Sequence, residues 1–261
     1  MPVIPSGRPR NGRRPGDVSY LSLALPDVAR GERFYAGLLG WTFPVGQPGR
    51  PQGDGVTPEV EQGGGVTPEV GMWDGARPGR AATRGAVPGF RVEDIGVSVV
   101  RVRDLGGTAT DAVERPYGLE AECSDNQGLP LFLHQLPDEP ADDGTDLTNG
   151  RQHGDVAYLT FEVADLGLAE AFYGPLLGWS FSAGSVDEGR QITGVTPMAG
   201  LWAGGTPGLI PAYRVDDIGV AVARTAELGG VAGPIDERPY GLAADFCRDD
   251  QGIRFHLVEL G

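Results

Sequence analysis

The sequence predicts an α+β fold made of four βαβββ modules, paired into two tandem halves that each form a cup-shaped mixed sheet. The main observation is an internal repeat, in which segments of the first half recur in the second. The matched segments are 18–27 with 156–165, 34–43 with 172–181, 93–97 with 216–220, and 114–119 with 237–242. A second observation is that a strand-then-helix pattern starts twice within each half.

Each half opens on alternating apolar residues, at 18–25 and at 156–163, which are typical of a strand. An aspartate then stands where a helix N-cap is expected, apolar residues recur at helical spacing, and a glycine stands where the helix ends. These positions are Asp27 and Gly40 in the first half and Asp165 and Gly178 in the second.

The same cycle restarts later in each half. A strand is expected near 89–93 or 212–216, and the following helix ends at Gly106-Gly107 or Gly229-Gly230. Further short strands follow. A strand with one face on its own helix leaves the other face free, so two such modules enclose a cup.

The repeat also sets the expected organisation of the chain. Residues 1–16 are rich in Arg, Pro and Gly and read as a disordered tail, without the apolar stretch of a signal peptide. The two domains are expected at 17–137 and 153–261, joined by an acidic linker at 138–152. A local duplication, Val56–Val60 repeated at Val66–Val70, is expected to lengthen one loop of the first domain.

Composition excludes several classes of function. The chain carries 36 acidic residues against 21 basic ones, and its net charge of −15 argues against binding to nucleic acid or to an anionic membrane. No apolar run reaches the length of a transmembrane helix. Cys123 and Cys247 occupy matching places in the two halves, so we expect buried thiols without a disulfide, in a cytoplasmic protein.

Three motifs carry a resemblance to a known family. They are Asp-(x)6-Phe-Tyr-(x)3-Leu-Gly-Trp, then Pro-Tyr-Gly, then Asp-x-Gln-Gly followed by a strand, and they occur in both halves. The pattern resembles the vicinal oxygen chelate superfamily, which includes glyoxalases, bleomycin-resistance proteins and extradiol dioxygenases. Tandem proteins of this type resemble actinobacterial proteins, some of them from antibiotic pathways. The resemblance implies two tandem glyoxalase-like domains, but fold alone does not choose the activity.

The resemblance also implies where a metal would bind. Metal-dependent relatives usually place a His seven residues before the capping Asp and a Glu four residues after the turn glycine. In this sequence those positions hold Tyr20 and Phe132 in the first half, and Tyr158 and His256 in the second. Asp74 is the nearest candidate for a middle ligand. A catalytic metal site needs about three His, Asp, Glu or Cys ligands, so we expect no metal in either half and no other cofactor.

Strand alternation predicts which side chains share the ligand face of each cup. The first cup is expected to be mainly aromatic and apolar, and its candidate ligand contacts are Tyr20, Ser22, Phe132, His134 and Trp73. The second cup is expected to be polar, with Tyr158, Thr160, Glu162, Arg254 and His256 on one wall and Trp202 beside them. The tryptophans and tyrosines can equally be core or cup lining.

Glu162, His256 and Tyr158 are the candidate catalytic residues. Glu162 and His256 replace Ala24 and Phe132 of the first half, and a carboxylate beside an imidazole suits general acid–base chemistry. The alternative is structural: Glu162 neutralises a buried arginine, and His256 fills volume with one hydrogen bond.

Two functions follow. The first is a metal-independent enzyme of secondary metabolism that acts by acid–base chemistry on an aromatic or polyketide-like natural product in the second cup. The reaction would be a dehydration, cyclisation, isomerisation or rearrangement. The second is a non-catalytic protein of the bleomycin-resistance type that binds and sequesters an antibiotic. In both, the partner is a small hydrophobic or aromatic ligand, and the chain is a monomer or a homodimer.

Overall fold

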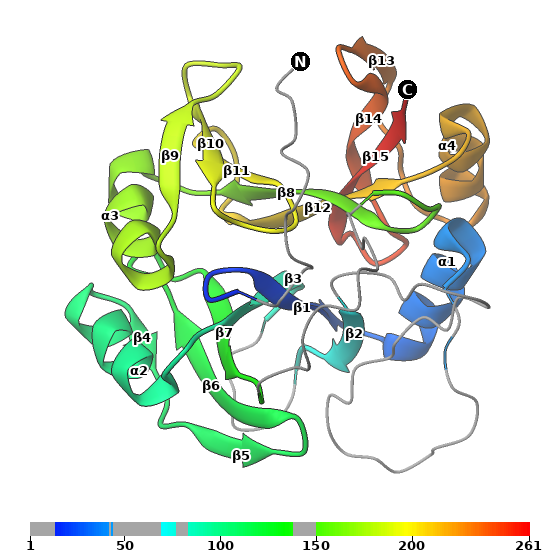
Figure 1. Ribbon diagram of the computed structural model, residues 1–261. Coiled ribbons are helices and arrows are strands. Elements are labelled where there is room, and N and C mark those ends of the chain that lie inside the picture. Colours follow the sequence, from blue (N-terminus) through cyan, green and yellow to red (C-terminus); the bar gives the residue numbers. More distant parts are fainter. Residues whose placement is uncertain (1–13, 42, 44–68, 77–82, 138–149) are drawn as a thin grey trace.

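The computed structural model describes residues 14–41, 43, 69–76, 83–137 and 150–261, which form four helices and fifteen strands (Figure 1). The local duplication at 56–70 lies almost wholly outside these residues, as do most of the expected tail and linker. The described part has the α+β fold that the repeat predicts: a strand followed by a helix occurs four times, and the strands form mixed sheets.

The elements follow in chain order. Those of the first half are β1 Val18–Leu25, α1 Val28–Leu39, β2 Glu69–Asp74, β3 Gly85–Arg91, α2 Ile95–Asp104, β4 Thr108–Ala109, β5 Val113–Arg115, β6 Gly118–Ser124 and β7 Pro130–Gln135. Those of the second half are β8 Val156–Glu162, α3 Leu166–Leu177, β9 Ser180–Ala183, β10 Gly189–Thr193, β11 Ala199–Trp202, β12 Gly208–Arg214, α4 Ile218–Glu227, β13 Ile235–Arg238, β14 Gly241–Arg248 and β15 Arg254–Leu260.

The helix signals of the sequence are confirmed. The Asp27 carboxylate accepts a hydrogen bond from Arg30 N at the start of α1, and Asp165 does the same for Leu168 N at the start of α3. Gly40 ends α1 with a φ of 69°, in the left-handed region that favours glycine. The strands expected near 89–93 and 212–216 begin earlier, at 85 and 208. Each runs through a proline, a residue that usually interrupts a strand pattern.

The two modules of each half join along their first strands. β1 pairs antiparallel with β3, and β8 pairs antiparallel with β12. Each of these four strands has a parallel neighbour on its other side. In the first half β2 pairs with β1 and β7 with β3; in the second half β11 pairs with β8 and β15 with β12. The sheets of the two halves meet at a single residue pair, Ala86 of β3 with Leu209 of β12.

The first helix of each half packs against the other half. In α1, Tyr35 lies with its ring centroid 6.1 Å from that of Tyr213 on β12, and Phe34 lies 6.1 Å from Phe255 on β15. In α3, Tyr173 lies 6.3 Å from Phe90 on β3. Figure 1 shows the result, with α1 beside α4 and α3 beside α2. One aromatic core therefore spans both halves.

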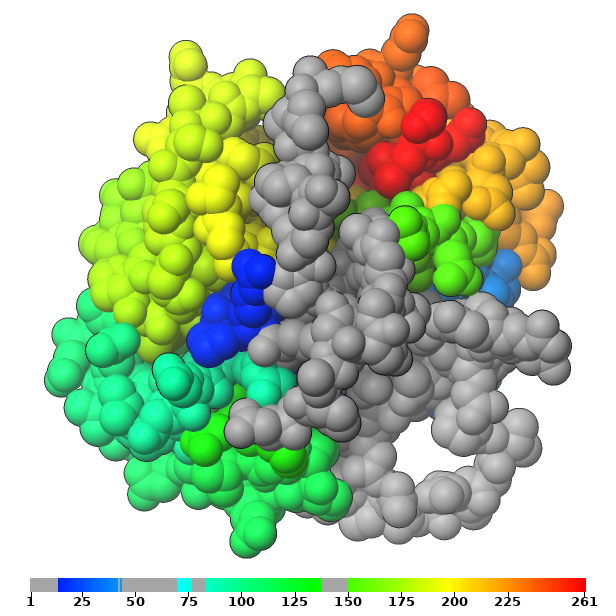
Figure 2. Space-filling view, in the orientation of Figure 1, coloured from blue at the N-terminus to red at the C-terminus, as the bar shows by residue number. Residues whose placement is uncertain are grey.

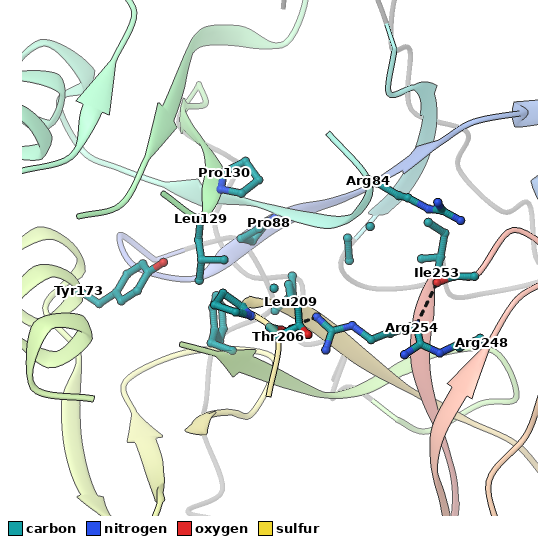
Figure 3. A pocket seen from close by; sticks show the side chains of 16 residues that line it. Arg84, Pro88, Leu129, Pro130, Tyr173, Thr206, Leu209, Arg248, Ile253 and Arg254 are labelled. Carbon is teal, nitrogen blue, oxygen red and sulfur yellow. Dashed lines mark hydrogen bonds between the residues drawn. The ribbon is translucent and has the colours of Figure 1, made fainter. Parts of the chain in front are cut away.

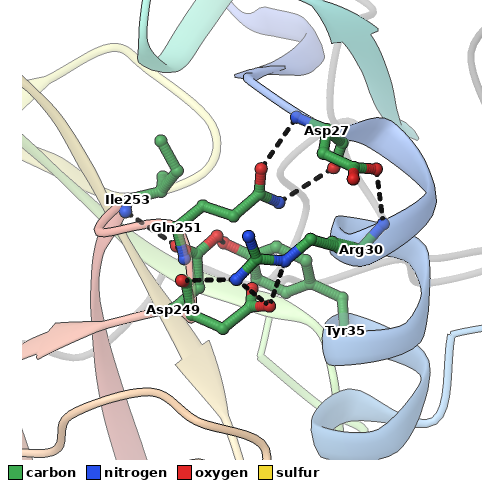
Figure 4. Close-up of polar contacts among 7 residues, drawn as sticks. Asp27, Arg30, Tyr35, Asp249, Gln251 and Ile253 are labelled. Atoms are coloured by element: carbon green, nitrogen blue, oxygen red, sulfur yellow. Dashed lines mark hydrogen bonds and ion pairs between the residues drawn. The ribbon is translucent and has the colours of Figure 1, made fainter.

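Polar contacts repeat this exchange (Figure 4). The Gln251 side chain accepts from Asp27 N at 2.8 Å and donates to Asp27 O at 2.9 Å, while the Tyr35 hydroxyl donates to Asp249 at 3.3 Å. The second half is held in the same way: Gln127 binds the backbone of Asp165 at 2.7 and 3.0 Å, and Tyr173 donates to Asp125 at 3.0 Å. The Asp-x-Gln-Gly motif of each half thus holds the first helix of the other.

The residues at the start of β1 and just before it join the same interface. Val18 N donates to Thr196 O and Thr196 N donates to the Asp17 carboxylate, both at 3.0 Å. Figure 2 shows these N-terminal residues, in blue, against the yellow surface of the second half. Cys123 and Cys247 are buried free thiols, as expected. None of the helices in the described residues has the length and apolar character needed to cross a membrane.

Candidate functional site

The second half brings Tyr158 and His256 to one face of its sheet. Tyr158 on β8 and His256 on β15 both lie opposite Ala212 of β12, one on each side of it. Residues in register on neighbouring strands point to the same face, so the phenol and the imidazole flank the Ala212 methyl. The alternate residues of the two strands, Leu159 and Phe161 on β8 and Leu257 on β15, point the other way, into the core.

His256 has a hydrogen-bond partner in either protonation state. Its Nδ1 lies 3.2 Å from the backbone nitrogen of Phe246 and 3.2 Å from Oδ1 of Asp245. A neutral imidazole can accept from the Phe246 N–H, and an imidazolium can donate to the Asp245 carboxylate. Burial lowers the pKa of His256 below its usual value, against the opposing pull of Asp245. The ring is therefore neutral at pH 7. When it gains a proton, it can donate a hydrogen bond to the Asp245 carboxylate.

A distortion of β14 creates this arrangement. The register between β14 and β15 shifts between Ala244 and Cys247, which is a β-bulge. Phe246 lies in the bulge with a φ of 60°, the only non-glycine residue with positive φ among those the structure describes. Its side chain is 68% exposed and its ring stands edge-on to His256 at 6.2 Å. Strained residues and bulges are concentrated at functional sites, where they redirect side chains.

Tyr158 is suited to donating a hydrogen bond. Burial raises its pKa to about 12, so the hydroxyl keeps its proton at neutral pH. The hydroxyl donates to Gln191 Oε1 at 3.4 Å, a long bond. A Cβ on the neighbouring Gly200 would collide with the phenol oxygen. Glycine at this position therefore makes room for the Tyr158 hydroxyl.

The expected pairing of Glu162 with His256 is not present among the described residues. Glu162 is buried and forms an ion pair with Arg254, whose other nitrogen donates to Thr206 O at 2.7 Å. The reason is register: Glu162 lies opposite Gly208 of β12, four residues from the Ala212 that lies opposite His256. This contact with a guanidinium is the one that the structural alternative for Glu162 describes.

The other expected contacts of the second cup lie on the same face. Thr160 is half-buried between Ile210 of β12 and Gly200 of β11, and Trp202 lies opposite Glu162. Arg254 precedes His256 by two residues on β15, so both side chains point to this face.

In the first half, Tyr20 and Phe132 flank Gly89, the counterpart of Ala212. His134 stacks on Phe132 at 6.2 Å and meets Tyr20 edge-on at 6.4 Å. Ser22 is buried on the same strand face as Tyr20, and Trp73 is buried opposite Ala24. The aromatic character expected of this cup is present.

The first cup also holds a polar network that the sequence did not reveal. Glu120 accepts from Tyr117 at 2.5 Å and from Arg115 at 3.0 Å, and its carboxylate lies 3.6 Å from His134 Nε2. The opposite nitrogen of His134, Nδ1, lies 3.0 Å from the Ser19 hydroxyl. Burial acts against ionisation of Glu120, but hydrogen bonds from His134 and Tyr117 prevail and lower its pKa to about 2. The network thus keeps a charged carboxylate.

Asp245 and Phe246 were also missed, although the repeat contains a signal for them. The spacing from the Pro-Tyr-Gly tyrosine to the cysteine is six residues in the first half, Tyr117 to Cys123, and seven in the second, Tyr240 to Cys247. One extra residue in a strand that is otherwise repeated is the sequence signature of a bulge.

The residues do not fit a catalytic metal. No group of three His, Cys, Asp or Glu side chains within the described ranges could hold an ion. At the positions where the resemblance implies a His and a carboxylate, the first half offers a phenol and a phenyl ring, and the second a phenol and one imidazole. A protonated phenol is a poor ligand, so we derive no reaction step through a metal.

Comparison with known proteins gives structural matches alone: no protein-family model and no curated sequence matches the chain. A Mn(II)-bound glyoxalase from Novosphingobium aromaticivorans has a TM-score of 0.65 at 16% identity, over 94% of this chain and 82% of that one. An extradiol ring-cleaving dioxygenase from B. fuscum scores 0.62 at 15% identity, over 97% and 75%. A mutant of 4-hydroxymandelate synthase from Streptomyces coelicolor scores 0.57 at 16% identity, over 95% and 93%. At these identities the likeness is one of fold.

Proposed function

We propose that this chain, which has the fold of the vicinal oxygen chelate superfamily, is a metal-independent enzyme that transfers protons on a small aromatic or polyketide-like molecule in its second cup. The observation that carries the proposal is His256, whose Nδ1 is placed between a hydrogen-bond donor and a carboxylate. A carboxylate that accepts a hydrogen bond from Nδ1–H leaves the other ring nitrogen able to take up a proton.

The mechanism assigns a role to each side chain. In the tautomer whose Nδ1–H donates to the Asp245 carboxylate, neutral His256 accepts a proton from the substrate at Nε2, and Asp245 stabilises the imidazolium that forms. Tyr158, protonated at neutral pH, donates a hydrogen bond to the oxygen that gains negative charge when that proton leaves. Glu162 forms an ion pair with Arg254 and has no part in the proposed proton transfer. Dehydration, cyclisation and isomerisation beside a carbonyl all begin with this step.

The test uses hydroxylated tetralones, aromatic ketones with C–H bonds beside the carbonyl, as probes. They are incubated in D2O with EDTA-treated protein and followed by NMR. We expect deuterium incorporation or conversion of at least one compound, at a rate that rises with pH through the lowered pKa of His256. His256→Gln should reduce the rate about 100-fold or more, because a general base contributes that much. His153→Gln, which changes a half-buried histidine bonded to Leu38 O, is the control and should keep full activity. Unchanged turnover in His256→Gln would remove the mechanism.

One observation favours the second candidate, a binding protein. Phe246 and Tyr240 are 68% and 51% exposed in the same half, and Phe246 adjoins His256. Exposed aromatic rings can stack on a flat ligand. Saturable binding of these probes without deuterium incorporation or product would favour sequestration over catalysis.

A further inference from the structure

A cavity of about 240 Å³ lies where the sheets of the two halves meet. β3 and β12 form its floor at the Ala86–Leu209 pair, and the turn before β15 forms one side (Figure 3). We call it the junction cavity. His256 and Tyr158 are not among its lining residues, and of the second cup's expected contacts it shares Arg254.

Positive charge dominates the junction cavity. Its lining includes Arg84, Arg248 and Arg254 but no aspartate or glutamate, in a chain whose net charge is −15. Of the three, Arg254 is ion-paired with Glu162. Within the described residues, Arg84 and Arg248 have no carboxylate partner. Both are exposed, so their charges are available to a ligand.

These two arginines converge on one residue. Arg248 Nη1 donates to Gly252 O at 3.3 Å, and Arg84 Nη2 lies 3.1 Å from the point where a Cβ on Gly252 would stand. Two guanidinium groups on one glycine repel each other unless an anion lies between them. Guanidinium groups are well suited to carboxylate and phosphate oxygens, which they bind in bidentate fashion.

The remaining wall is apolar. Pro88, Leu129, Pro130, Leu209 and Ile253 line the cavity beside the arginines. Binding sites of this kind combine an apolar wall with a few polar groups that fix the orientation of the ligand. We propose that the junction cavity binds a small organic anion, a carboxylate or a phosphate on an apolar body, with the anionic group on Arg84 and Arg248.

The proposal is tested by calorimetry on the full chain with benzoate, phenyl phosphate and the neutral benzamide. We expect saturable binding of at least one anion, weakened by added salt, and none of benzamide. The two anions show which acid the site prefers. Equal binding of benzamide, or no binding of either anion, would overturn the proposal.

Variants locate the site. Arg84→Gln/Arg248→Gln should weaken anion binding at least tenfold. If the double variant does not fold, Arg84→Gln alone should also weaken binding, because it changes only one exposed side chain. Arg33→Gln removes the same charge from an exposed position on α1 and should leave binding unchanged. His256→Gln should also leave it unchanged, which separates this result from the proposed proton transfer. Anion binding that survives in the double variant would place the ligand elsewhere.

Discussion

At the scale of single residues, Glu120 shows how a side chain that looks ordinary in sequence becomes a charged group held in place. Tyr117, Arg115 and His134 surround its carboxylate and lower its pKa to about 2, from a usual 4.5. A lowered pKa means that the folded state favours the ionised form. This stabilisation is present in full above pH 4.5 and is lost as the pH falls toward 2.

Glu120→Gln should therefore destabilise the fold at pH 7 by about 1–2 kcal/mol, a value reduced for solvent screening because the carboxylate is not fully buried. The difference from wild type should shrink as the pH is lowered through 4.5 and vanish near pH 2. Urea unfolding at several pH values measures it. Glu114→Gln removes the same charge from an exposed position on β5 and should leave the free energy of unfolding at pH 7 nearly unchanged. A pH-independent loss in Glu120→Gln would contradict the assignment.

At the scale of elements, the sequence predicts features that depend on neighbouring residues, such as helix caps. It does not predict contacts between distant strands. The capping roles of Asp27 and Asp165 and the stop at Gly40 could be predicted because each depends on residues within one turn of helix. The choice between His256 and an arginine as the partner of Glu162 could not, because it depends on the register of strands whose paired residues are 92 positions apart. Strand alternation gives the face of a side chain, but not its distance from another on the same face.

The bulge in β14 places Phe246 in a left-handed backbone conformation, and the free energy that this conformation costs can be measured. A left-handed conformation costs a side-chain-bearing residue about 1–2 kcal/mol, and glycine avoids that cost but loses more entropy on folding. Because Phe246 is 68% exposed, little burial is lost on its replacement. Phe246→Gly should therefore stabilise the fold by up to about 1 kcal/mol, while Phe246→Ala should not, as judged by urea unfolding. If Phe246→Gly were the less stable of the two, the backbone would not be strained there.

At the scale of the whole molecule, side chains of each half bind the backbone at the start of a helix in the other half. Gln135 and Glu259 each accept from the first backbone N–H of a helix in their own half, at 2.9 Å for α2 and 2.8 Å for α4. For α1 and α3 the support comes from the other half, through Gln251 and Gln127. The repeat alone could not show this, because a sequence pattern does not say which copy of a motif meets which.

This exchange predicts that the two halves unfold together. Trp41 Nε1 donates to Gly154 O at 3.1 Å and Trp179 Nε1 donates to Gly16 O at 2.9 Å, so tryptophan fluorescence reports on both sides of the interface. Fluorescence and far-UV circular dichroism should give one coincident urea transition. Gln127→Ala and Gln251→Ala should each lower the free energy of unfolding by about 1–2 kcal/mol through lost hydrogen bonds to backbone.

The matched control for that experiment is Gln135→Ala, which removes a helix support within one half. All three variants should shift the whole transition, since a helix lost from either half exposes the aromatic core that both share. The two losses in Gln127→Ala/Gln251→Ala should add, because the sites are distant in the fold. Two resolved transitions in the wild-type chain, with each glutamine variant moving a single one, would mean that the halves are independent domains and that the aromatic contacts between Tyr35 and Tyr213 do not couple them.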